Sequence, residues 1–476
     1  MYLSTMKLFK LLLVCFALQN VANAQDSWRL RLQGHWNNPN LAVNPHMPGQ
    51  LWNELTGYVD SASQKEYIIM GSNDSVYFFD ITDPTQIRLC DVEFGTNRDA
   101  INRDVETYSH FAYCVSDNAP HGNLQIFDLQ YLPDSVHKVY EDDTLGANTH
   151  SIFIDKAAKR LYMCVNKYRS GKVNGLEILS LEKPDSPVYM GKLNEELFGS
   201  VSCKHVHEIY VRKDTAYCSC EYNGLFVIDF KDVANQKPLG SITTPYPYNG
   251  YNHTCWIDSS GQYIAFTDEV PRGLPAKIYQ IRDLSDMTYL THFNTHVGAT
   301  PHNVFWLGNK LYFSWYQDGV YIYTVDTPRY PRLYAYYDTY HQNEPGVYDN
   351  YRGCWGVYPF LPSGNIAASD MTNGLFILKY DVLAGMEPGL TPFAQLSVSP
   401  NPFLQSFRVR FIAKQSEKTG LQVKDIQGRI LYQQTMDTQA GENDSEINGL
   451  AELKSGIYFV VLRNESGFQT MKIVKE

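Results

Sequence analysis

Short hydrophobic runs recur along the chain between residues 66 and 380, at intervals of about fifty residues. In each interval, a first run rich in β-branched and aromatic residues is followed, after Gly, Asp or Asn, by a second run. The first runs occupy residues 66–70, 111–115, 160–165, 215–220, 263–267, 310–315 and 365–369, and the second runs occupy residues 76–80, 124–128, 176–180, 225–229, 277–281, 320–325 and 375–380. Short runs of this kind, without long helical periodicity, predict β-strands.

The repetition predicts the fold of this part of the chain. Seven copies, each with room for about four strands, indicate an all-β, seven-bladed β-propeller over residues 25–380. The seventh copy ends at Asp381 without an outer strand. We expect the alternating residues 28–32 to supply that strand, because pairing of the two ends would close the circle and cover its exposed edges.

The composition changes after Tyr380. Residues 381–395 contain Gly385, Pro388, Gly389 and Pro392, which is typical of a linker. Beyond them, further strand-like runs lie at residues 396–398, 407–411, 421–426, 429–433, 457–463 and 470–474. These runs predict a small Ig-like β-sandwich over residues 396–476.

The first 24 residues have the pattern of a signal peptide. Lys7 and Lys10 precede the apolar residues 11–18, and Ala22 and Ala24 provide small residues for cleavage. No later run approaches the roughly 18 apolar residues of a membrane-spanning helix. We therefore expect an exported chain without a transmembrane span.

The net charge and the cysteine content bear on which ligands the chain binds and on whether it forms disulfides. The formal net charge is −11, and it becomes −13 once the leader with its two lysines is removed. An acidic balance argues against nucleic-acid binding, which usually shows a basic surface. Eight of the nine cysteines lie beyond the leader, so disulfides are possible in an exported chain, but the spacing does not decide their pairing.

Four histidines occupy equivalent places at the start of the predicted inner strands of blades three to six. Acidic residues at the ends of the second strands should lie at the same end of the propeller. The candidate ligand-binding residues are His150, His207, His253, His302, Asp117, Glu221, Asp268, Glu269, Asp318 and Asp370. Imidazoles and carboxylates together can bind a divalent metal or polarise a ligand. Alternatively, the histidines lie in the seams between blades and hydrogen-bond to neighbouring loops.

Catalytic motifs are missing from the sequence. We find no G-x-S-x-G elbow, H-E-x-x-H pair or phosphate-binding loop. The tyrosine-rich residues 246–251 suit contact with a protein or a glycan. The sequence thus favours a binding module for such a ligand. A metal-assisted hydrolase or lyase that uses the histidines, and a structural surface scaffold, remain as alternatives.

The repeats resemble those of a known family. The run 224–229, Gly-Leu-Phe-Val-Ile-Asp, and the segments 80–84 and 355–359 are similar to the LVIVD repeats of the choice-of-anchor B family. The resemblance covers roughly residues 28–380. It implies an extracellular propeller, and it carries no settled biochemical activity.

The last eighty residues resemble the type A C-terminal sorting domain of the type IX secretion system. The residues that carry this motif are Pro400, Asn401, Pro402, Asp425, Gly428, Arg429, Gly456, Tyr458 and Lys472. The resemblance implies a Bacteroidota-type cell, interaction with the type IX machinery and its sortase, and cleavage near residues 381–395. It further implies release of the protein or its attachment to surface lipopolysaccharide.

Overall fold

The computed structural model describes residues 27–117, 124–146, 148–199, 201, 203–342, 346–381, 393–413, 415–425, 429–464 and 467–476. The predicted signal peptide and most of the predicted linker lie outside these residues. The chain divides into two compact units, Met1–Asp381 and Val382–Glu476. Within the described part of the chain, no helix has the length and hydrophobicity needed to cross a bilayer.

The first unit consists of antiparallel sheets that follow one another along the chain. Sheet 1 contains β3 (Trp52–Val59), β4 (Glu66–Ser72), β5 (Ser75–Asp80) and β6 (Arg88–Phe94). Sheet 2 contains β7 (Arg103–Tyr108), β8 (Phe111–Ser116), β9 (Leu124–Asp128) and β10 (His137–Asp142). Sheet 3 contains β11 (Ser151–Asp155), β12 (Arg160–Lys167), β13 (Val173–Ser180) and β14 (Val188–Lys192).

The next two sheets repeat this order. Sheet 4 contains β15 (Glu208–Arg212), β16 (Thr215–Ser219), β17 (Gly224–Asp229) and β18 (Lys237–Thr243). Sheet 5 contains β19 (Asn252–Ile257), β20 (Tyr263–Asp268), β21 (Ala276–Gln280) and β22 (Thr288–Phe293). Their strands agree with the expected strands of the fourth and fifth copies to within a few residues.

The last two sheets each include a strand from the start of the chain. Sheet 6 contains β23 (Val304–Leu307), β24 (Lys310–Trp315), β25 (Gly319–Thr324), β26 (Arg332–Tyr337) and β1 (Ser27–Trp28). Sheet 7 contains β27 (Cys354–Tyr358), β28 (Ile366–Asp370), β29 (Gly374–Tyr380) and β2 (Leu30–Trp36). Among the described residues, the helical structure is the 3₁₀ turn η1 (Pro84–Gln86).

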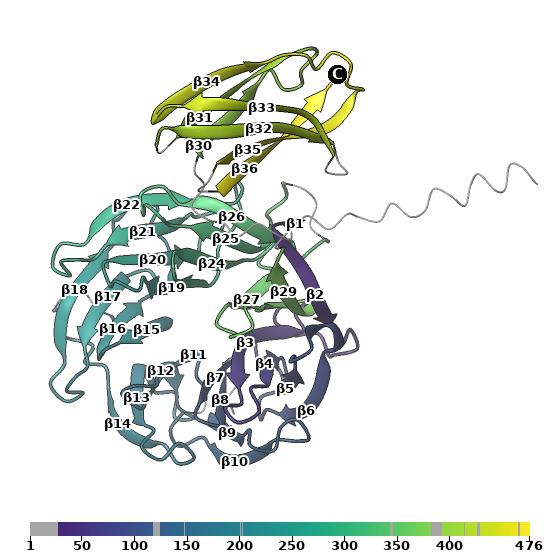
Figure 1. Cartoon of the computed structure of the whole chain (residues 1–476). Coiled ribbons are helices and arrows are strands. Elements are labelled where there is room, and N and C mark those ends of the chain that lie inside the picture. Colours follow the sequence, from purple (N-terminus) through teal and green to yellow (C-terminus); the bar gives the residue numbers. More distant parts are fainter. Residues whose placement is uncertain are drawn as a thin grey trace, which may run out of the picture. The chain divides into compact units, whose positions relative to one another are not determined.

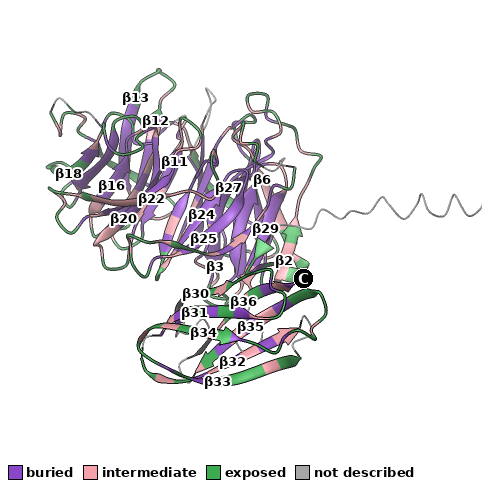
Figure 2. Cartoon of the chain, turned by 90° about the horizontal axis from the view of Figure 1, so that it is seen from above, coloured by how far each residue is buried: buried purple, intermediate pink, exposed green. Residues whose placement is uncertain are grey.

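These sheets are arranged in turn around a common centre, as in propeller-like proteins (Figure 1). The middle strands are fully buried, as in β4 and β8, whereas the outer strands β6 and β10 are partly exposed. Figure 2 shows buried residues concentrated in the strands of this unit and exposed residues mostly in its loops. Hydrophobic clusters form between neighbouring sheets; one contains Tyr113 and Ile126 of sheet 2 with Leu161 and Met163 of sheet 3. The core therefore fills the seams between the sheets.

The N-terminal strand pairs with the end of the first unit, as we expected. Leu30 pairs with Tyr380 and Trp36 with Leu375, so β2 completes sheet 7 as its outer strand. The boundaries differ from the prediction, because Ser27 and Trp28 pair with β26 of sheet 6 instead. Arg29, at φ 58°, lies between the two strands.

The cysteines take two roles. Cys203 and Cys220 form a disulfide that ties the loop before β15 to the end of β16. Cys114, Cys164 and Cys218 are free and buried within strands, where they act as small hydrophobic residues.

The second unit has two antiparallel sheets around its own core. One sheet contains β30 (Phe393–Ser399), β31 (Phe407–Ala413) and β34 (Gly441–Ile447), and the other contains β33 (Ile430–Thr438), β32 (Glu417–Asp425), β35 (Gly456–Asn464) and β36 (Gly467–Lys475). Strand β34 was not predicted. Its residues are polar, and only Ile447 among them is buried.

Candidate functional site

The four candidate histidines form an arc across sheets 3 to 6. His150 and His207 immediately precede the inner strands β11 and β15. His302 lies two residues before β23, and His253 is the second residue of β19. The centroids of successive imidazoles lie 4.0 Å, 4.4 Å and 4.4 Å apart. Because the sheets repeat, equivalent positions bring side chains that are about fifty residues apart in sequence into contact.

A chain of hydrogen bonds runs through the first two histidines. Asp117 Oδ2 lies 2.9 Å from His150 Nδ1, and His150 Nε2 lies 3.0 Å from His207 Nε2. His207 Nδ1 lies 2.9 Å from the hydroxyl of Tyr251, which also lies 3.2 Å from Glu221 Oε1. Both nitrogens of His150 and of His207 are thus engaged with protein groups.

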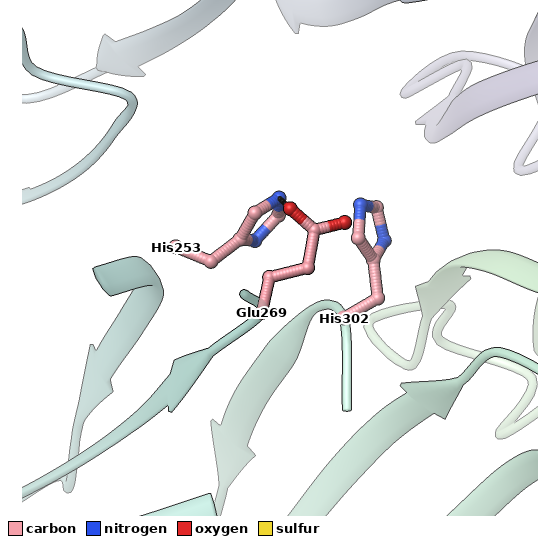
Figure 3. Close-up of side chains that lie close together, drawn as sticks. All are labelled: His253, Glu269 and His302. Atoms are coloured by element: carbon pink, nitrogen blue, oxygen red, sulfur yellow. Dashed lines mark ion pairs between the residues drawn. The ribbon is translucent and has the colours of Figure 1, made fainter. Parts of the chain in front are cut away.

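The other two histidines meet Glu269, and their geometry differs. One nitrogen or oxygen atom from each of His253, Glu269 and His302 lies within 4.8 Å of the other two. The carboxylate of Glu269 lies between the two imidazoles (Figure 3). We call these three residues the metal tripod.

Hydrogen bonds to neighbouring protein groups hold two of the tripod residues in place, and no hydrogen bond joins His253 to Glu269. His302 Nδ1 donates to the carbonyl oxygen of Trp355 at 2.5 Å, and Tyr316 donates to Glu269 Oε1 at 2.5 Å. His253 Nδ1 is buried without a hydrogen-bond partner. His253 Nε2 lies 3.9 Å from Glu269 Oε2, which is too long for a hydrogen bond.

Burial sets the protonation of the arc. It lowers the pKa of His207 and His253 well below the usual value, and neighbouring imidazoles lower both further. Burial also lowers the pKa of His302 to about 3 and raises the pKa of Glu269. The imidazoles of His207, His253 and His302 are therefore neutral at physiological pH, which is the form that binds a metal ion.

The arrangement has features of a metal site. Zn²⁺ and related ions bind imidazole nitrogen together with carboxylate oxygen, and metal-binding histidines usually donate their second nitrogen to a carbonyl or carboxylate group. His302 has that arrangement with Trp355. Three protein ligands leave a coordination position for water or an external ligand.

The remaining candidate acids lie outside the tripod. Asp268 is fully buried and pairs with Lys277 Nζ at 2.7 Å, so it is occupied by an internal ion pair. Asp318 accepts from Tyr348 at 2.7 Å, and Asp370 accepts the backbone N–H groups of Thr372 and Asn373. Adjacent Asp268 and Glu269 point to different partners, as expected for neighbouring strand residues.

Several residues of the site were not predicted. Tyr251, Tyr316 and the carbonyl of Trp355 orient the histidines and Glu269, but they reach the site from segments distant in sequence. Three further acids, Glu54 and Asp104 in the inner strands and Glu208 directly after His207, were also missed. Their recurrence at equivalent inner-strand positions is a signal that could have found them.

The motif residues of the C-terminal unit are described for the most part, while Gly428 lies outside the described residues. Asn401, between Pro400 and Pro402, accepts from the Val474 N–H at 2.8 Å and donates to the carbonyl of Lys472 at 3.3 Å. Asp425 accepts from the backbone N–H of Arg429 at 3.0 Å and pairs with its Nε at 2.7 Å. A hollow in this unit is lined by Asp425, Arg429, Leu431, Gly456, Ile457 and Tyr458.

Comparison with known proteins identifies the C-terminal unit. Residues 397–476 match the family described as the secretion system C-terminal sorting domain. This match implies interaction with the type IX secretion machinery and export to the cell surface or the extracellular space. A search of curated proteins found no match.

Solved structures are similar to this chain at low sequence identity. A chain of hydrazine synthase from Kuenenia stuttgartiensis is 13% identical, with 73% of this chain and 100% of that chain covered and a TM-score of 0.51. A protein from Lactobacillus plantarum is 11% identical, with coverages of 84% and 100% and a TM-score of 0.46. PorZ, a surface component of the type-IX secretion system of Porphyromonas gingivalis, is 11% identical, with coverages of 90% and 69% and a TM-score of 0.35.

Proposed function

We propose that this chain is an exported seven-bladed β-propeller that binds a divalent transition-metal ion and presents it to an external ligand. Seven successive antiparallel sheets support the blade count, with β2 and β29 as the closing pair. The repeated strands that end in Asp80, Asp128 and Asp229 support a propeller of the LVIVD-repeat, choice-of-anchor B kind. The sandwich of the second unit is Ig-like in this proposal.

Delivery follows from the two ends of the chain. Residues 1–24 act as a cleaved signal peptide, and the sorting domain directs passage across the outer membrane of a Bacteroidota-type cell. Cleavage near residues 381–395 then releases the propeller or attaches it to surface lipopolysaccharide. The match of residues 397–476 to the sorting-domain family supports this step.

The metal tripod carries the binding function. Three metal-binding side chains converge within 4.8 Å. His253 Nε2 faces Glu269 Oε2 at 3.9 Å without a hydrogen bond between them, so an ion placed between the two atoms would engage both. The contacts of His302 to Trp355 and of Glu269 to Tyr316 would hold the other two ligands in place.

The external ligand is a protein or a glycan with an oxygen donor for the open coordination position. Tyr222, which is 57% exposed, lies 5.2 Å from Tyr251, and the latter contacts His207 in the arc. An exposed aromatic side chain near the histidine arc suits a sugar face or a peptide, because tyrosine combines contact area with a polar tip. A metal-assisted hydrolase would use the same coordination position for water.

The test measures the metal in the purified mature chain and its rebinding after chelation. Isothermal titration with ZnCl₂ should show one site, and both His253→Ala and Glu269→Gln should weaken binding at least about tenfold. His46→Ala, at an exposed histidine, is the matched control and should bind as the wild type does. Equal binding by the tripod variants and the wild type would overturn the proposal.

Export is tested separately. Removal of residues 382–476 in a host with a type IX system should leave the propeller in the periplasm, whereas the intact chain reaches the cell surface or the medium. An unchanged distribution would contradict the assigned role of the C-terminal unit.

A further inference from the structure

A buried lysine in sheet 5 lies against a buried aspartate of the neighbouring strand. Lys277 in β21 and Asp268 at the end of β20 are both fully buried, and Lys277 Nζ donates to Asp268 Oδ2 at 2.7 Å. Phe266 is the residue opposite Lys277 in the pairing of the two strands. Asp268, two residues further along β20, lies on the same face, so the lysine side chain reaches it diagonally across the strands.

The two charges of this pair are costly to bury. Each side chain loses its hydration, and the attraction between the charges offsets that loss only in part. Burial lowers the pKa of Lys277, which favours the neutral amine, and the Phe266 ring lies 5.7 Å from Nζ. A reaction that turned both charged groups into one neutral group would remove the cost of burying them.

Two hydrogen-bond donors hold the other oxygen of the carboxylate. The hydroxyl of Tyr246 donates to Asp268 Oδ1 at 2.6 Å, and the backbone N–H of Gly250 donates to the same atom at 3.2 Å. Paired donors of this kind stabilise the negative charge that develops on a carbonyl oxygen when a nucleophile attacks its carbon. The carboxyl group of Asp268 thus has an amine at one oxygen and an oxyanion hole at the other.

A buried amide without a partner lies beside the pair. Asn252 of β19 is directly opposite Asp268, so the two side chains lie on the same face of the sheet. Asn252 is 0% exposed, and within the described part of the chain neither its Nδ2 nor its Oδ1 has a hydrogen-bond partner. Buried polar groups are normally satisfied by protein or by ordered water. This amide therefore offers a donor and an acceptor to a water molecule formed beside the carboxyl group.

We propose that Lys277 and Asp268 condense in the folded chain and form an isopeptide bond between β20 and β21. One proton passes from Nζ to Oδ2 within the ion pair, and Nζ then forms a bond to Asp268 Cγ. A second proton passes from the nitrogen to Oδ2, the bond between Cγ and Oδ2 breaks, and one water molecule leaves. Oδ1 remains as the carbonyl oxygen of the new amide.

The fold supplies what this reaction requires. It holds the amine and the carboxyl group in contact, which replaces an encounter in solution by a step within one molecule. The reaction consumes no oxidant, and its only second product is water. The bond would close residues 268–277 into a covalent loop, and it stands independently of the metal tripod and of the function proposed for it.

The test measures the mass of the wild-type mature chain under denaturing conditions, after reduction of its disulfide. An ion pair dissociates there and an amide persists, so the chain should be lighter than its sequence by one water molecule. Trypsin should yield a branched peptide made of residues 232–272 and 273–282, because the amide blocks cleavage after Lys277. A chain of full mass, with cleavage after Lys277, would overturn the proposal.

Variants assign the reaction to these residues. Lys277→Arg keeps a positive charge beside Asp268 but has no amine, so it should retain the full mass. Tyr246→Phe removes one donor to Oδ1 and should slow formation of the bond after refolding by about 100-fold. Tyr248→Phe, at a neighbouring tyrosine that is 51% exposed, is the matched control and should react as the wild type does.

Two outcomes with the variants count against the proposal. Loss of water from Lys277→Arg would place the reaction elsewhere in the chain, and equal rates for Tyr246→Phe and Tyr248→Phe would contradict the oxyanion hole. The mass of the wild type decides whether the bond exists even where a variant fails to fold.

Discussion

The Nε2 atoms of His150 and His207 lie 3.0 Å apart, so one of them must carry the hydrogen and the other must accept it. Asp117 lies against Nδ1 of His150 and favours a hydrogen there. His150 Nε2 is then the acceptor and His207 Nε2 the donor. His207 Nδ1 lies 2.9 Å from the hydroxyl of Tyr251, which donates to Glu221 Oε1. The chain of contacts thereby assigns a tautomer to each imidazole.

We predict that Tyr251→Phe destabilises the first unit by about 1–3 kcal/mol, because it removes the hydroxyl that contacts both His207 Nδ1 and Glu221 Oε1. Chemical denaturation measures the free energy of unfolding. Tyr222→Phe is the matched control, because this neighbouring tyrosine is 57% exposed, and it should change the free energy little. Equal effects of the two substitutions would contradict the structural role of the Tyr251 hydroxyl.

The buried carboxyl group of Asp370 should make the stability of the first unit depend on pH. The side chain is fully buried, and burial raises its pKa from 3.8 to about 7. Between these two values the folded state binds a proton that the unfolded state has lost, so this carboxyl group lowers stability as the pH rises from about 4 to 7.

The substitution Asp370→Asn should remove the contribution of this carboxyl group to the pH dependence of stability. The stability of the variant relative to the wild type should rise by roughly 3–4 kcal/mol between pH 4 and pH 7, with little change above pH 7. Denaturation of both proteins at a series of pH values measures the difference. The exposed Asp134→Asn should give a curve parallel to that of the wild type, and a parallel curve for Asp370→Asn would refute the assignment.

Two leucines of strand β2 should differ in how much they contribute to the free energy of unfolding. Leu30 is 3% exposed and packs in the cluster between sheets 6 and 7, whereas Leu32 in the same strand is 40% exposed. Leu30→Ala should cost about 2–5 kcal/mol of unfolding free energy, as expected for a buried leucine. Leu32→Ala should cost much less, and thermal or denaturant unfolding of the two variants tests the difference.

We predict that export by the sorting domain depends on the turn in which Asp425 binds Arg429. Asp425→Ala removes both contacts to Arg429 and should reduce the fraction of protein that leaves the cell, because the hollow lined by motif residues loses its shape. Immunoblots of cell fractions measure this export. Asp437→Ala, at an acid whose side chain is 79% exposed on β33, is the control and should be exported normally.

The strands were largely predictable because their pattern is local. Buried runs such as Ser75–Asp80 and Gly224–Asp229 were recognised from a few consecutive residues. Strand β34 was not, because its mostly polar sequence is held by pairing with β31 rather than by burial of its own side chains. Pairing of that kind cannot be read from the strand itself.

The site was predictable in part. Equivalent positions in the repeat identified His253, His302 and Glu269, but not Tyr316 or Trp355, whose approach depends on the packing of sheets 6 and 7. The sequence also did not show that Asp268 is paired with Lys277, a residue of the adjacent strand. The histidine positions drew the prediction to one side of the inner strands, so the acids on the other side were missed.

The pairing of Leu30 with Tyr380 has a consequence for the order in which the molecule is assembled. An exported chain emerges with its N-terminus first, so β2 reaches the far side of the membrane while its partner strand is still behind it. A contact between residues so distant in sequence carries a large entropy cost and forms late. Until then, β2 must avoid pairing with other exposed strands. The interval before sheet 7 is complete is therefore the stage at which this protein is most prone to aggregate and to be bound by chaperones.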